Sequence, residues 1–122
     1  MFQQDWVLQQ VKTLVLFIAR LVFKKDKIEY QITDPENLTE TDRVYYEINA
    51  LLARSRICEA EDLLFEKMDR GDLEYLKLAA DFYQRINGWS DEELEAADFS
   101  RDEIYSGLGD IMQEFGLPKF TQ

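Results

Sequence analysis

The sequence predicts an all-α fold of five to six helices, stacked as antiparallel helical hairpins, with a long apolar helix at the N-terminus. Apolar residues recur at three- and four-residue steps along most of the chain, which is the spacing of one face of an α-helix. Serine, threonine or aspartate precedes several of these periodic segments, as it does at helix N-termini. The connections between the segments are short, and helices joined by short turns pack as antiparallel neighbours.

One domain is expected for the whole chain of 122 residues, because a chain of this length can bury one sizeable core. Hydrophobic residues make up 46% of the sequence and aromatic residues 13%, which is enough to build that core. We expect a long apolar helix over residues 1–23, a connecting loop over residues 24–37 and a body of helical hairpins over residues 38–116.

The N-terminal helix is predicted over about residues 4–23, where glycine and proline are absent. Apolar residues cover most of its circumference and leave a narrow polar stripe, so the helix must be covered on more than one side. Lys12, near the middle, would cost about 2.5–3.5 kcal/mol in a membrane-spanning helix, which weakens a transmembrane interpretation. The candidate protein-interaction residues are Trp6, Leu14, Phe17, Ile18 and Leu21.

Residues 24–37 have the least regular pattern of the chain. Apolar and polar residues alternate from Ile28 to Ile32, as they do in a strand, but one such run does not make a sheet. We therefore expect a flexible connecting loop here. In the body, Thr39 or Thr41 is expected to begin a helix, and a tight break is expected near Ser55.

The helix after Ser55 is predicted to end at Gly71, in the left-handed conformation that glycine favours at helix C-termini. This pair of helices resembles a tetratricopeptide hairpin, with a small residue at the turn followed by Glu59-Ala60. A shift of 34 residues matches few further positions, so the sequence predicts repeat-like hairpins and not a repeat array. Asp72 is expected to open the next helix, and Asn87-Gly88 to end it.

Two capping boxes predict the last two helices. Ser90 with Glu93 opens a short helix, and Ser100 with Glu103 opens the final one, because in each pair the two side chains accept each other's free backbone N–H groups. The final helix is expected to stop at Gly116 and Pro118. Gly107 and Gly109 lie inside it at a cost of about 1 kcal/mol each, which favours close packing against a neighbouring element.

The sequence gives no catalytic, cofactor-binding or metal-binding residues. Histidine is absent, which removes the commonest general base and metal ligand. Cys58 is the only cysteine; Arg54 and Arg56 could lower its pKa and make it reactive, but a buried structural thiol is the favoured interpretation. The carboxylates of residues 91–98 lack the central glycine of a calcium loop and suit the first turn of a helix. We therefore expect no enzyme, no cofactor and no metal.

The charge of the chain is strongly acidic and unevenly placed. The net charge is −11, which disfavours binding to nucleic acid. Residues 1–30 carry five basic and three acidic side chains, a net of +2, and residues 31–122 carry nine basic and 22 acidic ones, a net of −13. A single cysteine and the lack of a signal-peptide pattern indicate a cytoplasmic protein.

Several motifs resemble a family of uncharacterised small all-helical proteins of Gram-positive Firmicutes. They are Phe2-x-x-Asp5-Trp6, Ile18-Ala19-Arg20, Glu59-Ala60-Glu61-Asp62-Leu63-Leu64-Phe65, Asp81-Phe82-Tyr83, Ser90-Asp91-Glu92-Glu93-Leu94, Phe99-Ser100-Arg101-Asp102-Glu103-Ile104 and Gly107-Leu108. The resemblance spans nearly the whole chain. It implies a domain of unknown function with a tetratricopeptide-like look and a bacterial cytosol, and it transfers no catalytic residue.

Two functions remain open from the sequence. The first is a protein-interaction or scaffold module, with an unknown protein partner or a second copy of the chain covering the apolar N-terminal helix. The alternative is peripheral association with a membrane surface through the same basic, apolar helix. The strongly acidic body opposes that alternative, because anionic lipid would repel it.

Overall fold

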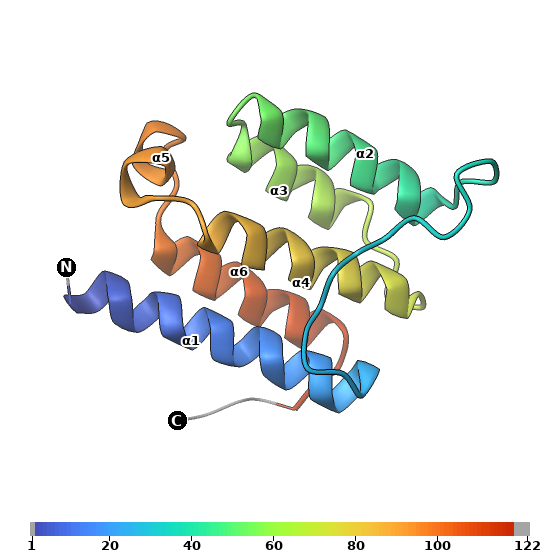
Figure 1. Ribbon diagram of the computed structural model, residues 1–122, viewed down its shortest axis with the longest axis horizontal. Helices are drawn as coiled ribbons and strands as arrows, with labels where there is room; N and C mark the ends of the chain where they lie inside the picture. Colours follow the sequence, from blue (N-terminus) through green and yellow to red (C-terminus); the bar gives the residue numbers. More distant parts are fainter. Residues whose placement is uncertain (1, 119–122) are drawn as a thin grey trace.

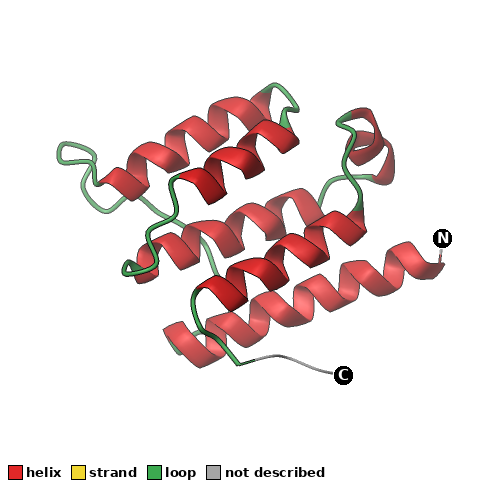
Figure 2. Ribbon diagram, turned by 180° about the vertical axis from the view of Figure 1, so that it is seen from behind, coloured by secondary structure: helices red, strands yellow, loops and turns green. Residues whose placement is uncertain are grey.

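The computed structural model describes the backbone of residues 2–118 and the side chains of residues 5–118 (Figure 1). Its elements are α1 (Phe2–Ile18), a π-helical continuation η1 (Ala19–Phe23), α2 (Glu40–Ala53), α3 (Ile57–Glu66), α4 (Leu73–Asn87), α5 (Asp91–Ala96) and α6 (Arg101–Glu114). The described part contains helices and connections but no strand (Figure 2). The all-α prediction, including the long N-terminal helix, is confirmed.

Helix α4 lies at the centre of the fold. It contacts α1, α2 and α6, and 10 of its 15 residues are buried. Along the body, α2, α3, α4 and α6 alternate in direction, whereas α1 lies beside α6 and runs the same way (Figure 1). The outer side of α1 is therefore the far edge of the stack, with no helix of the described chain beyond it.

The predicted helix N-termini are confirmed at four positions. Thr39 begins α2, and its side chain accepts the N–H of Asp42 while Asp42 accepts the N–H of Thr39. Asp72 caps α4 through the N–H of Glu74 at 3.0 Å. Reciprocal capping boxes at Ser90 and Ser100 begin α5 and α6. These side chains satisfy N–H groups that a helix leaves free.

Helices α2, α5 and α6 each end in a left-handed residue. Ser55 and Asp98 have φ of 58°, and Gly116 has φ of 70°. At each end two backbone hydrogen bonds close the last turn, as in a Schellman motif; after α6, for example, the N–H of Leu117 reaches the carbonyl of Met112 at 2.9 Å. The prediction for Gly71 is wrong. Helix α3 ends at Glu66, and Gly71 lies in a later turn where its N–H binds the Asp69 carboxylate.

The connection over residues 24–37 has no regular secondary structure, as expected, but it is anchored to the body. Ile28 and Tyr30 are buried, and the residues between and beside them point outward. The Tyr30 hydroxyl donates to Asp42 of α2, and the Gln84 amide of α4 donates to the carbonyl of Ile28. The strand-like alternation of this connection therefore buries one of its sides against the helices, although the connection does not pair in a sheet.

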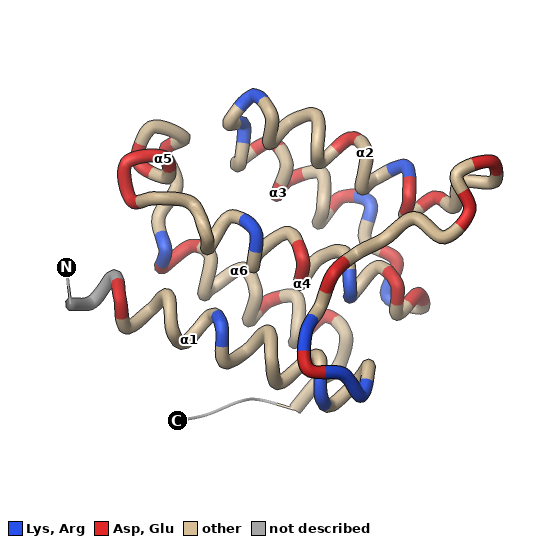
Figure 3. Tube along the Cα trace, viewed as in Figure 1, with Lys and Arg blue, Asp and Glu red and all other residues tan. Residues whose placement is uncertain are grey.

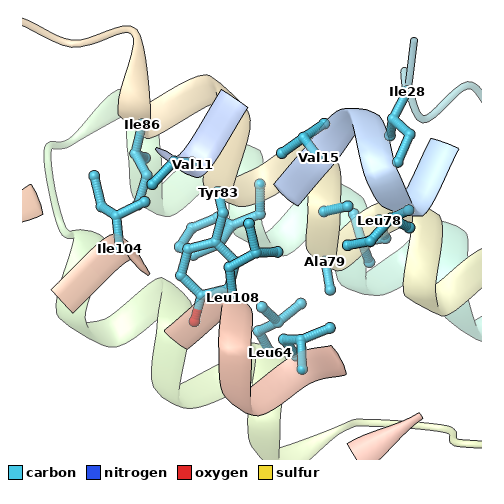
Figure 4. Packing of buried hydrophobic residues seen from close by; sticks show 14 of the residues in the cluster. Val11, Val15, Ile28, Leu64, Leu78, Ala79, Tyr83, Ile86, Ile104 and Leu108 are labelled. Atoms are coloured by element: carbon cyan, nitrogen blue, oxygen red, sulfur yellow. The ribbon is translucent and has the colours of Figure 1, made fainter. Parts of the chain in front are cut away.

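The hydrophobic core joins α1, α3, α4 and α6 (Figure 4). Val11 of α1 lies towards Ile86 of α4 and Ile104 of α6, and all three are fully buried. Leu64 of α3 and Leu108 of α6 extend the same cluster to the other side of α4. Since α1 contributes Val11, Leu14, Val15 and Ile18 to this cluster, the N-terminal helix is an integral part of the domain.

Candidate interaction surface

The inner side of α1 is covered by its own domain. Val7, Val11, Leu14 and Ile18 are between 0% and 8% exposed, and they lie against α4 and α6. By length and composition alone, residues Asp5–Phe23 could also cross a membrane, but 33% of that segment is buried inside the fold. Core helices of soluble proteins pass the same test of length and hydropathy. The burial explains why the inner side of this helix is apolar.

Its outer side carries a second, exposed apolar stripe. We define the α1 face as the following residues: Trp6, Gln9, Gln10, Thr13, Leu16, Phe17, Arg20 and Leu21. Trp6 is 58% exposed and Leu21 is 39% exposed, and they are two of the four large hydrophobic side chains that are exposed in the described part of the chain. A shallow groove of about 420 Å³ runs along the C-terminal half of the face, lined by Thr13, Leu16, Phe17, Arg20, Leu21 and Lys24.

The five candidate residues fall on different sides of the helix. Leu14 is 4% exposed and Ile18 is 0% exposed, so both belong to the core and are not available to a partner. Trp6 and Leu21 are exposed, and Phe17 is half-buried and packs against the core. Because nearly the whole circumference is apolar, the 3.6-residue period could not indicate which side the domain covers.

Sequence reasoning missed part of this face. Leu16 belongs to it, together with the polar Thr13 and Arg20. The signal was present in the sequence, since Leu16 is an apolar residue that lies within the polar stripe of the helix. Contiguous exposed apolar surface, rather than a single exposed apolar residue, marks an interaction site.

The C-terminal end of the α1 face is basic. The π-helical turn η1 ends at Lys24, whose φ of 57° reverses the chain, and the N–H of Lys25 closes the turn on the Ala19 carbonyl at 3.0 Å. Arg20 pairs with Asp26 at 3.4 Å, but both side chains stay largely exposed, so this contact is weak. Figure 3 shows basic residues gathered at this end of α1 and acidic residues towards its other end and on α5.

A second groove, of about 550 Å³, lies where α6 meets α1. Its lining residues are Leu14, Tyr105, Ser106, Gly109, Asp110, Met112, Gln113, Gly116, Leu117 and Pro118. Most of its surface is apolar. Helix α1 contributes Leu14, which is 4% exposed, to the lining of this groove.

Cys58 does not have the surroundings of a reactive thiol. The residue is exposed, so the prediction of a buried structural thiol is wrong in this respect. Partial desolvation raises the pKa of the thiol, and the carboxylates of Glu103, Asp98, Glu61 and Asp62 raise it further. These carboxylates outweigh any effect of Arg54 and Arg56, and the protonated form is favoured.

Glu61 and Tyr83 form a partly buried polar contact. The Tyr83 hydroxyl donates to Glu61 at 2.5 Å. Burial raises the pKa of Glu61, the hydrogen bond from Tyr83 opposes that rise, and the neighbouring carboxylates of Glu103, Asp62 and Asp110 add to it. Among the side chains that the structure describes, no three acidic or cysteine residues come together in a way that could hold a metal ion. The hydrogen bond between Tyr83 and Glu61 joins α4 to α3.

The comparisons with known proteins give one family match. The sequence matches a family of unknown function (DUF6483) over residues 1–116, a range that includes every helix described above. No curated protein and no solved structure matches the chain. The match extends over almost all of the sequence, and the chain belongs to the family of unknown function DUF6483.

Proposed function

We propose that this chain is a non-enzymatic, cytoplasmic protein-interaction module of tetratricopeptide-like helical hairpins, and that the α1 face is its docking surface. The observation that carries the proposal is the two-sidedness of α1. One side supplies the core, and the other exposes Trp6 and Leu21 beside an open groove. Large aromatic and aliphatic side chains presented on a rigid helix are the usual anchors of a protein interface.

The chemistry of the chain supports a binding role over a catalytic one. There is no histidine in the sequence, and the pKa of the lone thiol, Cys58, is raised. The surface of the larger groove is mostly apolar, and its polar side chains include Ser106, Asp110 and Gln113. The net charge of −11 disfavours nucleic acid as a partner.

Affinity capture from cells that naturally produce the protein tests this proposal. Deleting residues 1–23 is unsuitable, because it would remove Val11 and Ile18 from the core. Point variants on the surface avoid that problem. We compare the parent with Trp6→Ala/Leu21→Ser and with the control Tyr46→Ala/Leu73→Ser, whose side chains are 50% and 54% exposed on other helices.

We expect the α1-face variant, Trp6→Ala/Leu21→Ser, to lose proteins that both the parent and the control variant retain. Circular dichroism would check that all three samples are equally helical. If the α1-face variant and the control variant retain the same proteins, docking through α1 is contradicted.

Peripheral membrane association is the second candidate. It is favoured by the position of Arg20 and Lys24 beside the exposed Leu21, an arrangement in which apolar groups can enter a lipid surface while cations meet its headgroups. The acidic body opposes it. Co-sedimentation with vesicles containing phosphatidylserine separates the two proposals: the interaction module is expected to stay in the supernatant, and pelleting that Leu21→Ser abolishes would favour the membrane instead.

A further inference from the structure

We propose that the groove on the C-terminal half of the α1 face receives a short acidic segment of a partner protein, an amphipathic helix with carboxylates beside its apolar side chains. The proposal rests on the docking function and names the chemistry of the partner. Leu16, Phe17 and Leu21 give the groove an apolar lining. Its two charged lining residues, Arg20 and Lys24, are both basic, so the groove combines apolar contact with positive charge.

The positive charge around this groove is an exception on a strongly acidic molecule. Residues 12–27 carry five basic side chains and one acidic one, a net of +4, whereas the rest of the chain carries nine basic and 24 acidic ones, a net of −15. Figure 3 shows basic residues gathered at the C-terminal end of α1 and at the start of the connection that follows. A negatively charged partner is therefore attracted to this end of α1 and repelled by most of the remaining surface.

The two cations of the groove can bind a partner's carboxylates. The Arg20 side chain is 65% exposed, and its ion pair with Asp26, whose side chain is 89% exposed, contributes little to stability. The Lys24 ammonium donates to the carbonyl of Leu21 at 3.1 Å. Because an ammonium group has three donors, it can bind a carboxylate as well. Both cations therefore stand at the groove without being neutralised by a buried partner.

The backbone around the groove favours a helix over an extended segment as the occupant. The carbonyl of Ala19 accepts the N–H groups of Lys24 and Lys25, and the carbonyl of Leu21 accepts the Lys24 ammonium. An extended segment gains affinity by pairing with the open edge of a sheet, which a groove on one helix does not offer. A helix satisfies its own backbone and presents apolar side chains at three- and four-residue steps.

The same charge distribution favours a short segment over an anionic membrane. A lipid surface carries its negative charge over a wide plane, so it would meet the acidic body as well as the groove. A short helix carries its charge locally and covers little beyond the groove. The carboxylates of such a helix can lie beside Arg20 and Lys24 while its apolar side chains contact Leu16 and Leu21.

Selection from a phage-displayed library of random peptides, about 14 residues long or four helical turns, tests the chemistry of the partner. The full chain is the bait. We expect the enriched peptides to carry a net negative charge, with leucine, isoleucine or aromatic residues at three- and four-residue steps. Non-specific attraction predicts the opposite, because a protein with a net charge of −11 would enrich basic peptides.

Calorimetric titration with a synthetic copy of an enriched peptide tests the location. Arg20→Glu/Lys24→Glu should raise its Kd at least about tenfold, and Arg20→Gln/Lys24→Gln, which only removes the charges, should raise it less. Arg43→Glu/Arg56→Glu is the matched control: it changes the net charge equally, at exposed residues of α2 and of the turn before α3, and should change the Kd less than about threefold. Asp26→Asn removes the carboxylate that competes for Arg20 and should lower the Kd.

The contrary outcomes are distinguishable from one another. Neutral or basic peptides whose binding Leu21→Ser weakens would contradict the acidic partner and leave the docking function standing. Acidic peptides that bind Arg20→Glu/Lys24→Glu as tightly as the parent would overturn the assignment to this groove. A library without any groove-dependent binder would contradict peptide recognition, and the capture experiment would still decide whether the α1 face docks a protein. Pelleting with phosphatidylserine vesicles that Arg20→Glu/Lys24→Glu abolishes would assign the groove to a lipid surface instead.

Discussion

Gly107 and Gly109 are two residues apart in α6, and their surroundings are opposite. A Cβ atom on Gly107 would lie 2.6 Å from Glu61 Oε2 and even closer to the Tyr83 hydroxyl, so glycine is required for α6 to approach α3 and α4. A Cβ atom on Gly109 would meet nothing within 4 Å. The expectation that both glycines serve close packing is therefore confirmed for Gly107. The described contacts do not support it for Gly109.

The two glycines therefore give opposite predictions on replacement by alanine. Gly107→Ala is expected to lower the free energy of unfolding by about 1–3 kcal/mol, because it overpacks a filled site. Gly109→Ala is expected to raise it by up to about 1 kcal/mol, because alanine favours an open helical position. Urea denaturation measures both changes in the free energy of unfolding. A decrease for Gly109→Ala would contradict the prediction that the space beside Gly109 is open.

Glu61 predicts a dependence of stability on pH. Its pKa is raised in the folded protein, chiefly by burial, from an ordinary value of 4.5. A carboxyl with a raised pKa stabilises the fold below its ordinary pKa, and this contribution is lost as the pH rises from there through the folded value. Glu61→Gln does not titrate and can still accept the Tyr83 hydroxyl.

The free energy of unfolding of Glu61→Gln, relative to the parent, should therefore increase between about pH 4 and pH 7. Urea titrations at several pH values measure this difference. A constant difference across the range, or one that decreases as the pH rises, would contradict the raised pKa.

At the scale of the helices, Arg101 joins three elements. Its guanidinium is buried at 5% exposure and donates to the carbonyls of Asn87 and Trp89 at 2.7 Å and to Asp91 at 3.1 Å. The end of α4, the start of α5 and the start of α6 are held together by one side chain. Arg101 gave no signal in the sequence, because an arginine in the first turn of a helix is normally solvated.

Replacing this side chain tests its role as the junction. Arg101→Met fills similar space but leaves two carbonyls without their donor, so we expect a loss of about 2–4 kcal/mol in the free energy of unfolding. Arg70→Met is the control: Arg70 pairs with Glu114 at the surface, where such a pair contributes about 0–1 kcal/mol. Equal losses in the two variants would show that burial of Arg101 contributes nothing.

Local signals in the sequence predicted the helices well. Thr39, Asp72, Ser90 and Ser100 begin helices because their side chains bind backbone groups only two or three residues away. Gly71 failed because Asp69, also nearby, satisfies its N–H in a different turn. The burial of Tyr30 could not be predicted, since its partner Asp42 lies in another element and the contact depends on the tertiary fold.

At the scale of the whole molecule, the sequence identified α1 as the candidate surface but could not indicate its outward side. The period of a helix assigns Leu14 and Ile18 to one side and Leu16 and Phe17 to others, yet all four are apolar. Only the positions of α4 and α6 determine that Ile18 is fully buried and that Leu21 is exposed. The proposed docking function depends on this division of α1 into two sides.

The division can be measured directly by urea denaturation of Ile18→Ala and Leu21→Ala at submicromolar protein concentration, where self-association is negligible. Ile18→Ala is expected to lower the free energy of unfolding by about 2–5 kcal/mol, because it leaves a cavity in the core. Leu21→Ala is expected to lower it by less than about 1 kcal/mol, because Leu21 is exposed. Equal losses, or a larger loss in Leu21→Ala, would contradict the two-sided α1 and with it the docking surface.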